Sequence, residues 1–118
     1  MSTILLVDDD PDTRYILDLL LTAQGYRVVK ARNGYEAMEV ALSAPPDLVI
    51  SDWVMPVIDG TQLYRYFAAI PTLSTVPFVF ISGALPPDEV TVGPFLRKPF
   101  EPPLLFDLVA RSLGSLSG

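Results

Sequence analysis

The sequence predicts an α/β fold, a doubly wound sheet of five parallel strands in the flavodoxin-like order 2-1-3-4-5 with helices on both faces. Short apolar runs of strand length alternate with segments of helix length over the 118 residues, which is the pattern of right-handed βα units. The turn after the first apolar run carries acidic residues, where a dinucleotide-binding fold would need a glycine-rich phosphate loop. These observations favour the five-stranded order over the six-stranded dinucleotide fold.

The first predicted strand and helix are joined by an acidic turn. Residues 3–7 form an apolar run that leads into the acidic triplet 8–10. Asp10 followed by Pro11 is typical of a helix start, with Asp as the N-cap and Pro at the first helical position. Gly25 lies where the end of this helix is expected. The helix is marked by apolar residues at helical spacing: Ile16, Leu19, Leu20 and Ala23.

The next two strands repeat this arrangement. Residues 27–31 have the length of a second strand, and Asn33 precedes Glu36 in the arrangement of a capping box for the following helix. That helix carries small apolar residues on one narrow face: Ala37, Val40, Ala41 and Ala44. The unbroken apolar run 48–50 predicts a third strand that is covered on both faces and leads to Asp52. A third helix then presents a core-facing stripe: Leu63, Phe67 and Ile70.

The last two predicted strands each lead into a polar residue. Residues 76–81 predict a fourth strand that is followed by Ser82, and residues 94–97 predict a short fifth strand that is followed by Lys98. A last helix is expected from Pro102 onward, where proline is compatible with a helix start.

The segment between the fourth and fifth strands is short for a further helix. Its β-branched run 90–92 is a poor helix former, and the glycine and proline that follow would end any helix. We therefore expect the fourth helix of this fold to be shortened or absent. Apolar surface around Phe95 and Leu96 would then be exposed, which predicts a homodimer or docking face on the fifth strand and the last helix.

The composition excludes several classes of protein. The chain has no cysteine and no histidine, which excludes a disulfide framework, a thiolate zinc site and the usual general base. Its net charge of −6 argues against direct binding to nucleic acid. No apolar stretch approaches the roughly 20 residues that cross a bilayer, and the N-terminus lacks the features of a signal peptide. We expect one cytoplasmic domain without membrane contact at residues 1–114, with residues 115–118 as a tail or the start of a linker.

Polar residues stand where four of the predicted strands end. Asp8 and Asp9 follow the first strand, Asp52 ends the third, Ser82 follows the fourth and Lys98 follows the fifth. Because the carboxyl ends of parallel strands meet at one edge of the sheet, we expect these side chains to share a crevice. Clustered carboxylates repel one another unless a cation is present, and Mg²⁺ prefers oxygen ligands. A carboxylate nucleophile beside Mg²⁺, a lysine and a hydroxyl predicts phosphoryl-transfer chemistry.

These motifs resemble those of the receiver domains of two-component response regulators. The resemblance covers essentially the whole chain and is carried by four motifs: residues 4–9, residues 52–60, Ser82-Gly83 and residues 98–100. It implies that Asp52 accepts a phosphoryl group from a histidine kinase or a phosphotransfer protein. It also implies a signalling domain rather than an enzyme, although such a domain assists its own phosphorylation and dephosphorylation.

The resemblance implies roles for the other residues of the crevice. Mg²⁺ would be held by four oxygen ligands: the carboxylates of Asp8, Asp9 and Asp52 and the main-chain carbonyl of Val54. Lys98 would contact the phosphoryl group, and the Ser82 hydroxyl would move toward it. Phe95 occupies the position of the aromatic residue that changes rotamer in the family, where Tyr is commoner.

Two other functions stay open from the sequence. One is a receiver-like interaction module that does not switch, in which Asp52 would be dispensable. The other is a magnesium-dependent phosphohydrolase with an Asp nucleophile, although such enzymes generally add a cap domain for which this chain has no room. Taken singly, Asp52 has an ordinary explanation as a turn cap, Ser82 as a turn residue and Lys98 as a solvated side chain. Their joint position at the ends of different strands favours the phosphoacceptor.

Overall fold

The computed structural model describes residues 1–83 and 94–117, and for residues 115–117 it describes the backbone only. The elements of the described part follow one another in this order: β1 Thr3–Val7, α1 Pro11–Ala23, β2 Arg27–Ala31, α2 Gly34–Ser43, β3 Leu48–Asp52, α3 Gly60–Ala69, β4 Phe78–Ser82, β5 Phe95–Arg97 and α4 Pro102–Ser117. The predicted shortened or absent fourth helix falls on residues 84–93, which lie outside the described residues. The helix labelled α4 is therefore the last helix that the sequence predicts, which begins at Pro102.

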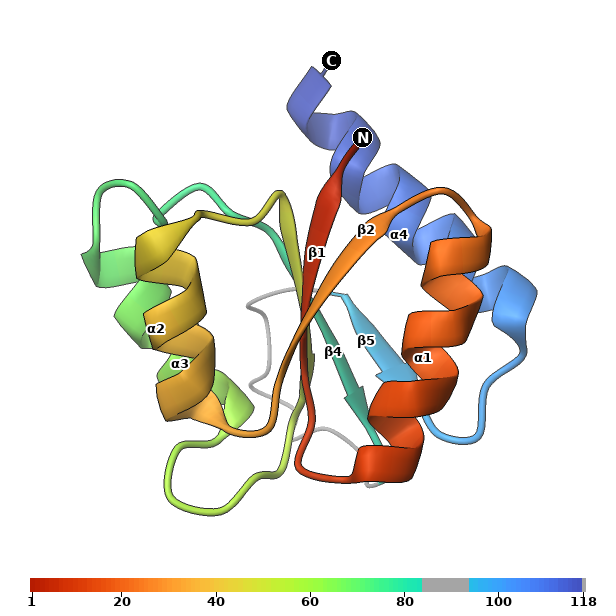
Figure 1. Ribbon diagram of the computed structural model, residues 1–118, viewed down its shortest axis with the longest axis horizontal. Coiled ribbons are helices and arrows are strands. Elements are labelled where there is room, and N and C mark those ends of the chain that lie inside the picture. The colour runs from red at the N-terminus through yellow and green to blue at the C-terminus, as the bar shows by residue number, and fades with distance from the viewer. Residues whose placement is uncertain (84–93, 118) are drawn as a thin grey trace.

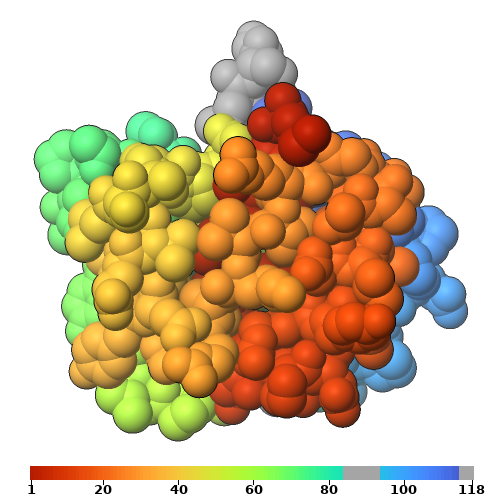
Figure 2. All heavy atoms as spheres, in the orientation of Figure 1, coloured from red at the N-terminus to blue at the C-terminus, as the bar shows by residue number. Residues whose placement is uncertain are grey.

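The five strands form one parallel sheet in the order β2-β1-β3-β4-β5, which confirms the predicted fold class. Helices α1 and α4 cover one face of the sheet, and α2 and α3 cover the other (Figure 1). The edge strand β2 lies between α1 and α2 on the surface shown in Figure 2. Within the described residues, no helix has both the length and the apolar character that a membrane span requires.

Alternate residues of each central strand enter opposite cores, because successive side chains of a strand point to opposite faces. In β1, Ile4 and Leu6 pack in the core under α1 and α4, whereas Leu5 and Val7 pack in the core under α2 and α3. All four of these side chains are fully buried. The near-continuous apolar runs seen in the sequence are thus explained by a sheet that is covered on both faces.

Side-chain caps fix where three of the helices begin. The carboxylate of Asp10 accepts a hydrogen bond from the Asp12 N–H, and Asn33 caps α2 by accepting from the Glu36 N–H at 2.9 Å, so both predicted N-caps are confirmed. The Glu36 carboxylate accepts from the Arg32 N–H rather than from the N-cap residue, so the predicted capping box is only half formed. A complete capping box instead begins α3: Asp59 and Gln62.

The core-facing side of α1 differs from the set of apolar residues that marked this helix in the sequence. Leu17 and Leu21 are the buried residues, whereas Ile16 and Leu19 are each 55% exposed. The helix contains more apolar residues than one face can bury, so spacing alone allowed more than one buried face. The apolar residues that are not buried, Ile16 and Leu19, form an apolar surface on α1.

Several predicted boundaries shift at the C-terminal end of the chain. Strands β4 and β5 each begin immediately after a proline, which cannot donate a ladder hydrogen bond. Helix α4 continues through residues 115–117, where the sequence predicted a tail or the start of a linker. Leu96 is only 3% exposed beneath α4, so the predicted exposure around Phe95 and Leu96 is wrong for Leu96, and Phe95 is half-buried.

Gly60 packs so closely that any side chain must displace its neighbours. A Cβ atom there would lie 2.8 Å from the main-chain oxygen of Asp52 and 3.2 Å from the ring of Phe80. Gly60→Ala is therefore expected to lower the free energy of unfolding by about 1–3 kcal/mol, as overpacking in a core does. Gly114→Ala is the control, because a Cβ there meets nothing within 4 Å and a helical alanine should leave stability equal or higher. Urea unfolding of both variants tests this, and a neutral Gly60→Ala would contradict it.

Candidate functional site

Three carboxylates come together at the carboxyl edge of the sheet. β1 pairs with β3 so that Val7 lies beside Ser51, which places Asp8 and Asp52 at neighbouring strand ends. One carboxylate oxygen from each of Asp8, Asp9 and Asp52 lies within 4.8 Å of the other two. The parallel topology therefore brings together acidic residues that are more than 40 positions apart in the chain.

Asp8 is the most enclosed member of this acidic cluster, with no exposed surface. Its Oδ1 accepts a hydrogen bond from the Asp10 N–H at 2.9 Å, and its Oδ2 lies 3.4 Å from the Lys98 Nζ. Burial raises the pKa of the Asp8 carboxyl above its usual range, while the Asp10 N–H and the Lys98 ammonium act in the opposite direction. The ion pair to Lys98 is long, so it offsets the cost of burying this carboxylate only in part.

Asp52 ends β3 and is half-buried. Burial and the neighbouring Asp8 charge raise the pKa of Asp52 to about 6, against the lowering effect of Lys98 and the Val54 N–H. At neutral pH Asp52 is therefore mostly ionised, although its burial and the nearby Asp8 charge disfavour the ionised form. A hard cation bound nearby would stabilise the ionised form of Asp52.

Lys98 and Ser82 lie side by side at the ends of β5 and β4. Ser82 is buried, pairs with Arg97 in the sheet, and its main-chain oxygen accepts a hydrogen bond from the Lys98 N–H at 2.8 Å. The Lys98 ammonium then reaches from this side of the edge to Asp8. The residues predicted to converge thus end adjacent strands at one edge of the sheet.

Phe95 belongs to an aromatic cluster that the sequence analysis did not identify. Trp53, directly after Asp52, meets the Phe80 ring edge-on with centroids 5.1 Å apart and the Phe95 ring at 5.8 Å. The ring of Trp53 therefore connects the end of β3 to β5. The sequence alone does not predict this contact, because it depends on β4 lying between β3 and β5 in the sheet.

The loop after β3 holds one residue in a strained backbone conformation. Met55 and Ile58 are buried in the core, and the Ile58 N–H donates to the Pro56 carbonyl at 2.8 Å, which closes a γ-turn around Val57. Val57 has φ of +69°, which is unfavourable for a β-branched residue. The buried side chains of Met55 and Ile58 hold this turn in the loop that follows Asp52, a conformation that the sequence did not predict.

The residues of the acidic cluster fit Mg²⁺. They supply hard oxygen donors from three carboxylates, and burial, together with repulsion from Asp8 in the case of Asp52, raises the pKa of Asp8 and Asp52, so a bound cation would stabilise their charged forms. Mg²⁺ typically uses one or two carboxylates plus waters and phosphate oxygens, which suits a cluster whose Asp9 is exposed. The carboxylates of Asp8, Asp9 and Asp52 could hold such an ion.

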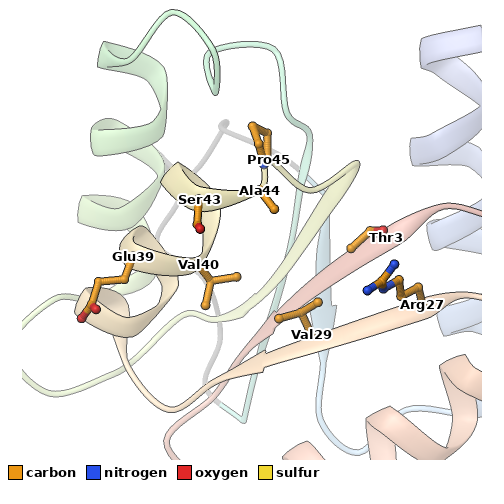
Figure 3. A pocket seen from close by; sticks show the side chains of 8 residues that line it. All are labelled: Thr3, Arg27, Val29, Glu39, Val40, Ser43, Ala44 and Pro45. Atoms are coloured by element: carbon orange, nitrogen blue, oxygen red, sulfur yellow. The ribbon is translucent and has the colours of Figure 1, made fainter.

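Another hollow of the surface, of about 470 Å³, lies away from this cluster. It is lined by residues of β2 and α2 and the turn that follows α2 (Figure 3). Thr3 and Arg27, which begin β1 and β2, stand on its rim, so it lies toward the amino-terminal edge of the sheet. It takes no part in the acidic site.

A doubly wound parallel sheet with this acidic cluster at its carboxyl edge belongs to the α/β class in which ligands bind beyond the strand ends. The chain belongs to the response regulator receiver domain family, whose model matches residues 4–110. This family consists of signalling domains, and the resemblance inferred from the four motifs is thereby confirmed.

Individual relatives agree with this assignment. The transcriptional regulatory protein GlrR of Escherichia coli strain K12 is 36% identical over 115 residues, which is 93% of this chain but only 26% of that protein. The receiver domain of a signal transduction histidine kinase from Syntrophus aciditrophicus is 32% identical, with a TM-score of 0.89 and coverage of 98% of this chain and 92% of that one. The receiver domain of sensor histidine kinase PA1611 from Pseudomonas aeruginosa, described with a magnesium ion coordinated in its active-site cleft, is 28% identical with a TM-score of 0.87 and coverage of 96% and 98%.

The raised pKa of Asp52 predicts a pH-dependent stability in metal-free buffer. Because the pKa rises from 3.8 to about 6 on folding, the folded chain binds more protons between these values, and the free energy of unfolding falls as pH rises through them. Asp52→Asn lacks this titration. After allowing for solvent at a half-buried group, the variant should exceed wild type by on the order of 1–2 kcal/mol at pH 7, with the difference vanishing near pH 4. Urea unfolding of both proteins across this range in EDTA tests the prediction, and a difference independent of pH would contradict it.

Proposed function

We propose that this chain is a phosphoacceptor receiver domain in which Asp52 accepts one phosphoryl group from a phosphohistidine of a kinase or phosphotransfer protein. The observation that supports this most is the acidic cluster of Asp8, Asp9 and Asp52, with the Lys98 ammonium 3.4 Å from Asp8. These 118 residues contain no histidine, so the donor histidine must lie outside them. A single carboxylate at the end of a central strand, flanked by acids on one side and a lysine on the other, suits phosphoryl transfer.

Each residue has a part in the proposed transfer. The Asp52 carboxylate attacks phosphorus, the phosphorus–nitrogen bond of the donor breaks, and the released imidazole nitrogen takes up a proton. Mg²⁺, when bound, supplies charge neutralisation for the phosphoryl oxygens. Its ligands would be the carboxylates of Asp8, Asp9 and Asp52 and the main-chain carbonyl of Val54. Lys98 would pair with a phosphoryl oxygen, and its present contact with Asp8 would keep it beside the site.

The signal is proposed to leave the site through Ser82 and Phe95. The Ser82 hydroxyl would donate to a phosphoryl oxygen on Asp52, and Phe95 would respond as the switch aromatic. The contact between Phe95 and Trp53 supports this route, because it ties β5 to the residue that follows the acceptor. A structural change at the end of β3 would therefore be transmitted to β5 through this contact.

Incubation with acetyl phosphate and Mg²⁺ followed by intact-protein mass spectrometry tests the proposal. A receiver gains one phosphoryl group, which stays in acid and is released by hydroxylamine. A non-switching interaction module gains none. A phosphohydrolase would release inorganic phosphate continuously in large molar excess over protein, so parallel measurement of free phosphate separates the three functions.

The groove beside Lys98 is a suitable place for the phosphodonor protein to dock. It has a volume of about 340 Å³, lies between α1 and the segment that follows β5, and is largely apolar; its lining includes Ile16, Leu20, Lys98 and Phe100. Because Lys98 lies in both the groove and the site, a protein seated there would place a side chain near Asp52. Ile16, which is more than half exposed, would be covered by that protein.

Ile16→Glu is expected to slow phosphoryl transfer from a phosphorylated histidine phosphotransfer protein by about fivefold or more, as loss of an apolar contact at an interface does. Labelling by acetyl phosphate should not change, because this small donor needs no docking surface. Tyr66→Glu, at an exposed position on α3, is the control. Equal transfer rates for wild type and Ile16→Glu would contradict the docking site.

Other features of the whole protein stay predictions. A homodimer through the face of β5 and the last helix has less support than the sequence suggested, because Leu96 is buried within its own chain. A cytoplasmic location and the absence of direct nucleic-acid binding are likewise untested expectations. Sedimentation equilibrium with and without acetyl phosphate would test the homodimer.

A further inference from the structure

One side chain outside the acidic cluster makes a hydrogen bond to the main chain of a residue in the cluster. Arg14, in the first turns of α1, donates from Nη1 to the main-chain oxygen of Asp8 at 2.6 Å. The side chain is half-buried, and the bond spans six residues to close the acidic turn between β1 and α1. A charged donor at this distance makes a strong hydrogen bond.

The bond acts on the peptide unit that joins two of the predicted metal ligands. The carbonyl of Asp8 lies in the plane of the peptide bond to Asp9, so the direction of this carbonyl fixes where the Asp9 backbone lies. Asp8 itself is held by its N–H to the Ala31 oxygen at 3.2 Å and by its Oδ1 to the Asp10 N–H. Asp9 has no such tie of its own among the described contacts, so its position depends on this peptide plane.

We propose that Arg14 is a positioning residue that orients Asp9 for metal binding by holding the carbonyl of Asp8. This inference rests on the proposed function, in which Asp9 is a ligand of Mg²⁺. The guanidinium makes no hydrogen bond or ion pair with the carboxylate of Asp8 or Asp9; its hydrogen bond is to the main chain. It thereby orders a ligand that lies on the exposed side of the cluster.

The positioning role and a purely electrostatic role predict opposite effects on metal affinity. A positive charge near the carboxylates repels a cation, so removing the Arg14 charge by itself should tighten Mg²⁺ binding. Loss of the hydrogen bond to Asp8 should instead weaken binding, because the Asp8–Asp9 peptide becomes free to turn. Residues that orient metal ligands typically change affinity by about 10–100-fold when lost. The sign of the change therefore decides between the two roles.

Arg14→Met tests this against Arg32→Met as a matched control. Arg32 follows β2 at the same edge of the sheet, and its side chain is 70% exposed and pairs with Glu36 at 2.9 Å. Its removal takes away the same charge without touching the acidic turn. Titration calorimetry with Mg²⁺ at constant ionic strength should give a Kd about tenfold higher for Arg14→Met and an equal or lower Kd for Arg32→Met. An equal or lower Kd for Arg14→Met would overturn the proposal.

A metal-free readout keeps this test separate from the proposed function. Hydrogen exchange of the Asp10 amide, which donates to Asp8, should be several-fold faster in Arg14→Met than in wild type and unchanged in Arg32→Met. Unchanged exchange would overturn the positioning role. If wild type binds no Mg²⁺, the proposed function fails, while faster Asp10 exchange would still show that Arg14 orders the turn. Should Arg14→Met not fold, Arg14→Gln, which keeps a polar side chain too short for this bond, takes its place with the same expected results.

Discussion

Asp52→Asn is expected to abolish phosphoryl uptake from acetyl phosphate in the presence of Mg²⁺. Asn has the shape of Asp but lacks the carboxylate oxygen that attacks phosphorus, so the adduct cannot form. Among the acids of the cluster, Asp52 stands at the end of the central strand β3, between β1 with its acidic turn and β4. Intact-protein mass spectrometry should show one added phosphoryl group for wild type and none for Asp52→Asn. This is a complete loss rather than a partial one.

Asp59→Asn provides a matched control in the same loop. Asp59 is the N-cap of α3 and accepts a hydrogen bond from the Gln62 N–H at 2.9 Å. Asn caps helices about as well as Asp, so the fold and the labelling should both be kept. Undiminished labelling of Asp52→Asn would show that Asp52 is not the acceptor, and loss of labelling in Asp59→Asn as well would show that the loss in Asp52→Asn reports a damaged loop.

Mg²⁺ is expected to raise the melting temperature of wild type by several degrees. The three carboxylates repel one another in the folded state, where one oxygen of each lies within 4.8 Å of the others, whereas in the unfolded chain Asp52 is far from Asp8 and Asp9. A ligand that binds only the folded chain adds about 1.4 kcal/mol of stability at ten times its Kd. For a domain of this size that corresponds to a rise of roughly 5 °C. Thermal unfolding in EDTA and in millimolar Mg²⁺, at equal ionic strength, measures it.

Asp9→Asn separates a specific metal site from a general salt effect. The substitution removes one negative charge from the cluster and one predicted ligand, so the melting temperature in EDTA should rise and the response to Mg²⁺ should shrink. Asp107→Asn is the control: Asp107 is exposed on α4 and pairs with Arg111, so it should leave the Mg²⁺ response at the wild-type value. A wild-type melt that is indifferent to Mg²⁺ would favour the non-switching module.

The order of the strands, and the polar residues that stand at their carboxyl ends, could be predicted from the sequence because they depend on local patterns. The apolar run of β1, the Asp10–Pro11 helix start and the Asn33 cap are each set by a few consecutive residues, and all three are confirmed. Parallel topology then determines which strand ends meet. That is why Asp8, Asp52 and their partners could be assigned to one edge before any distance was known.

Contacts between elements were decided only by the tertiary structure. The buried side of α1 could not be predicted because Ile16 and Leu19 are as apolar as the buried Leu17 and Leu21, and only packing against β1, β3 and α4 selects among them. Trp53 meets Phe95 because β4 places β3 and β5 two strands apart.

The conformation of the two loops that border the site was also settled by packing. Val57 has a positive φ in a short segment whose ends are both fixed, because Met55, two residues earlier, and Ile58, the next residue, are buried in the core. Arg14 reaches Asp8 only once α1 has folded back against the end of β1. Local sequence thus determined which residues stand at the carboxyl edge, whereas their orientation depended on distances between segments that meet only in the folded chain.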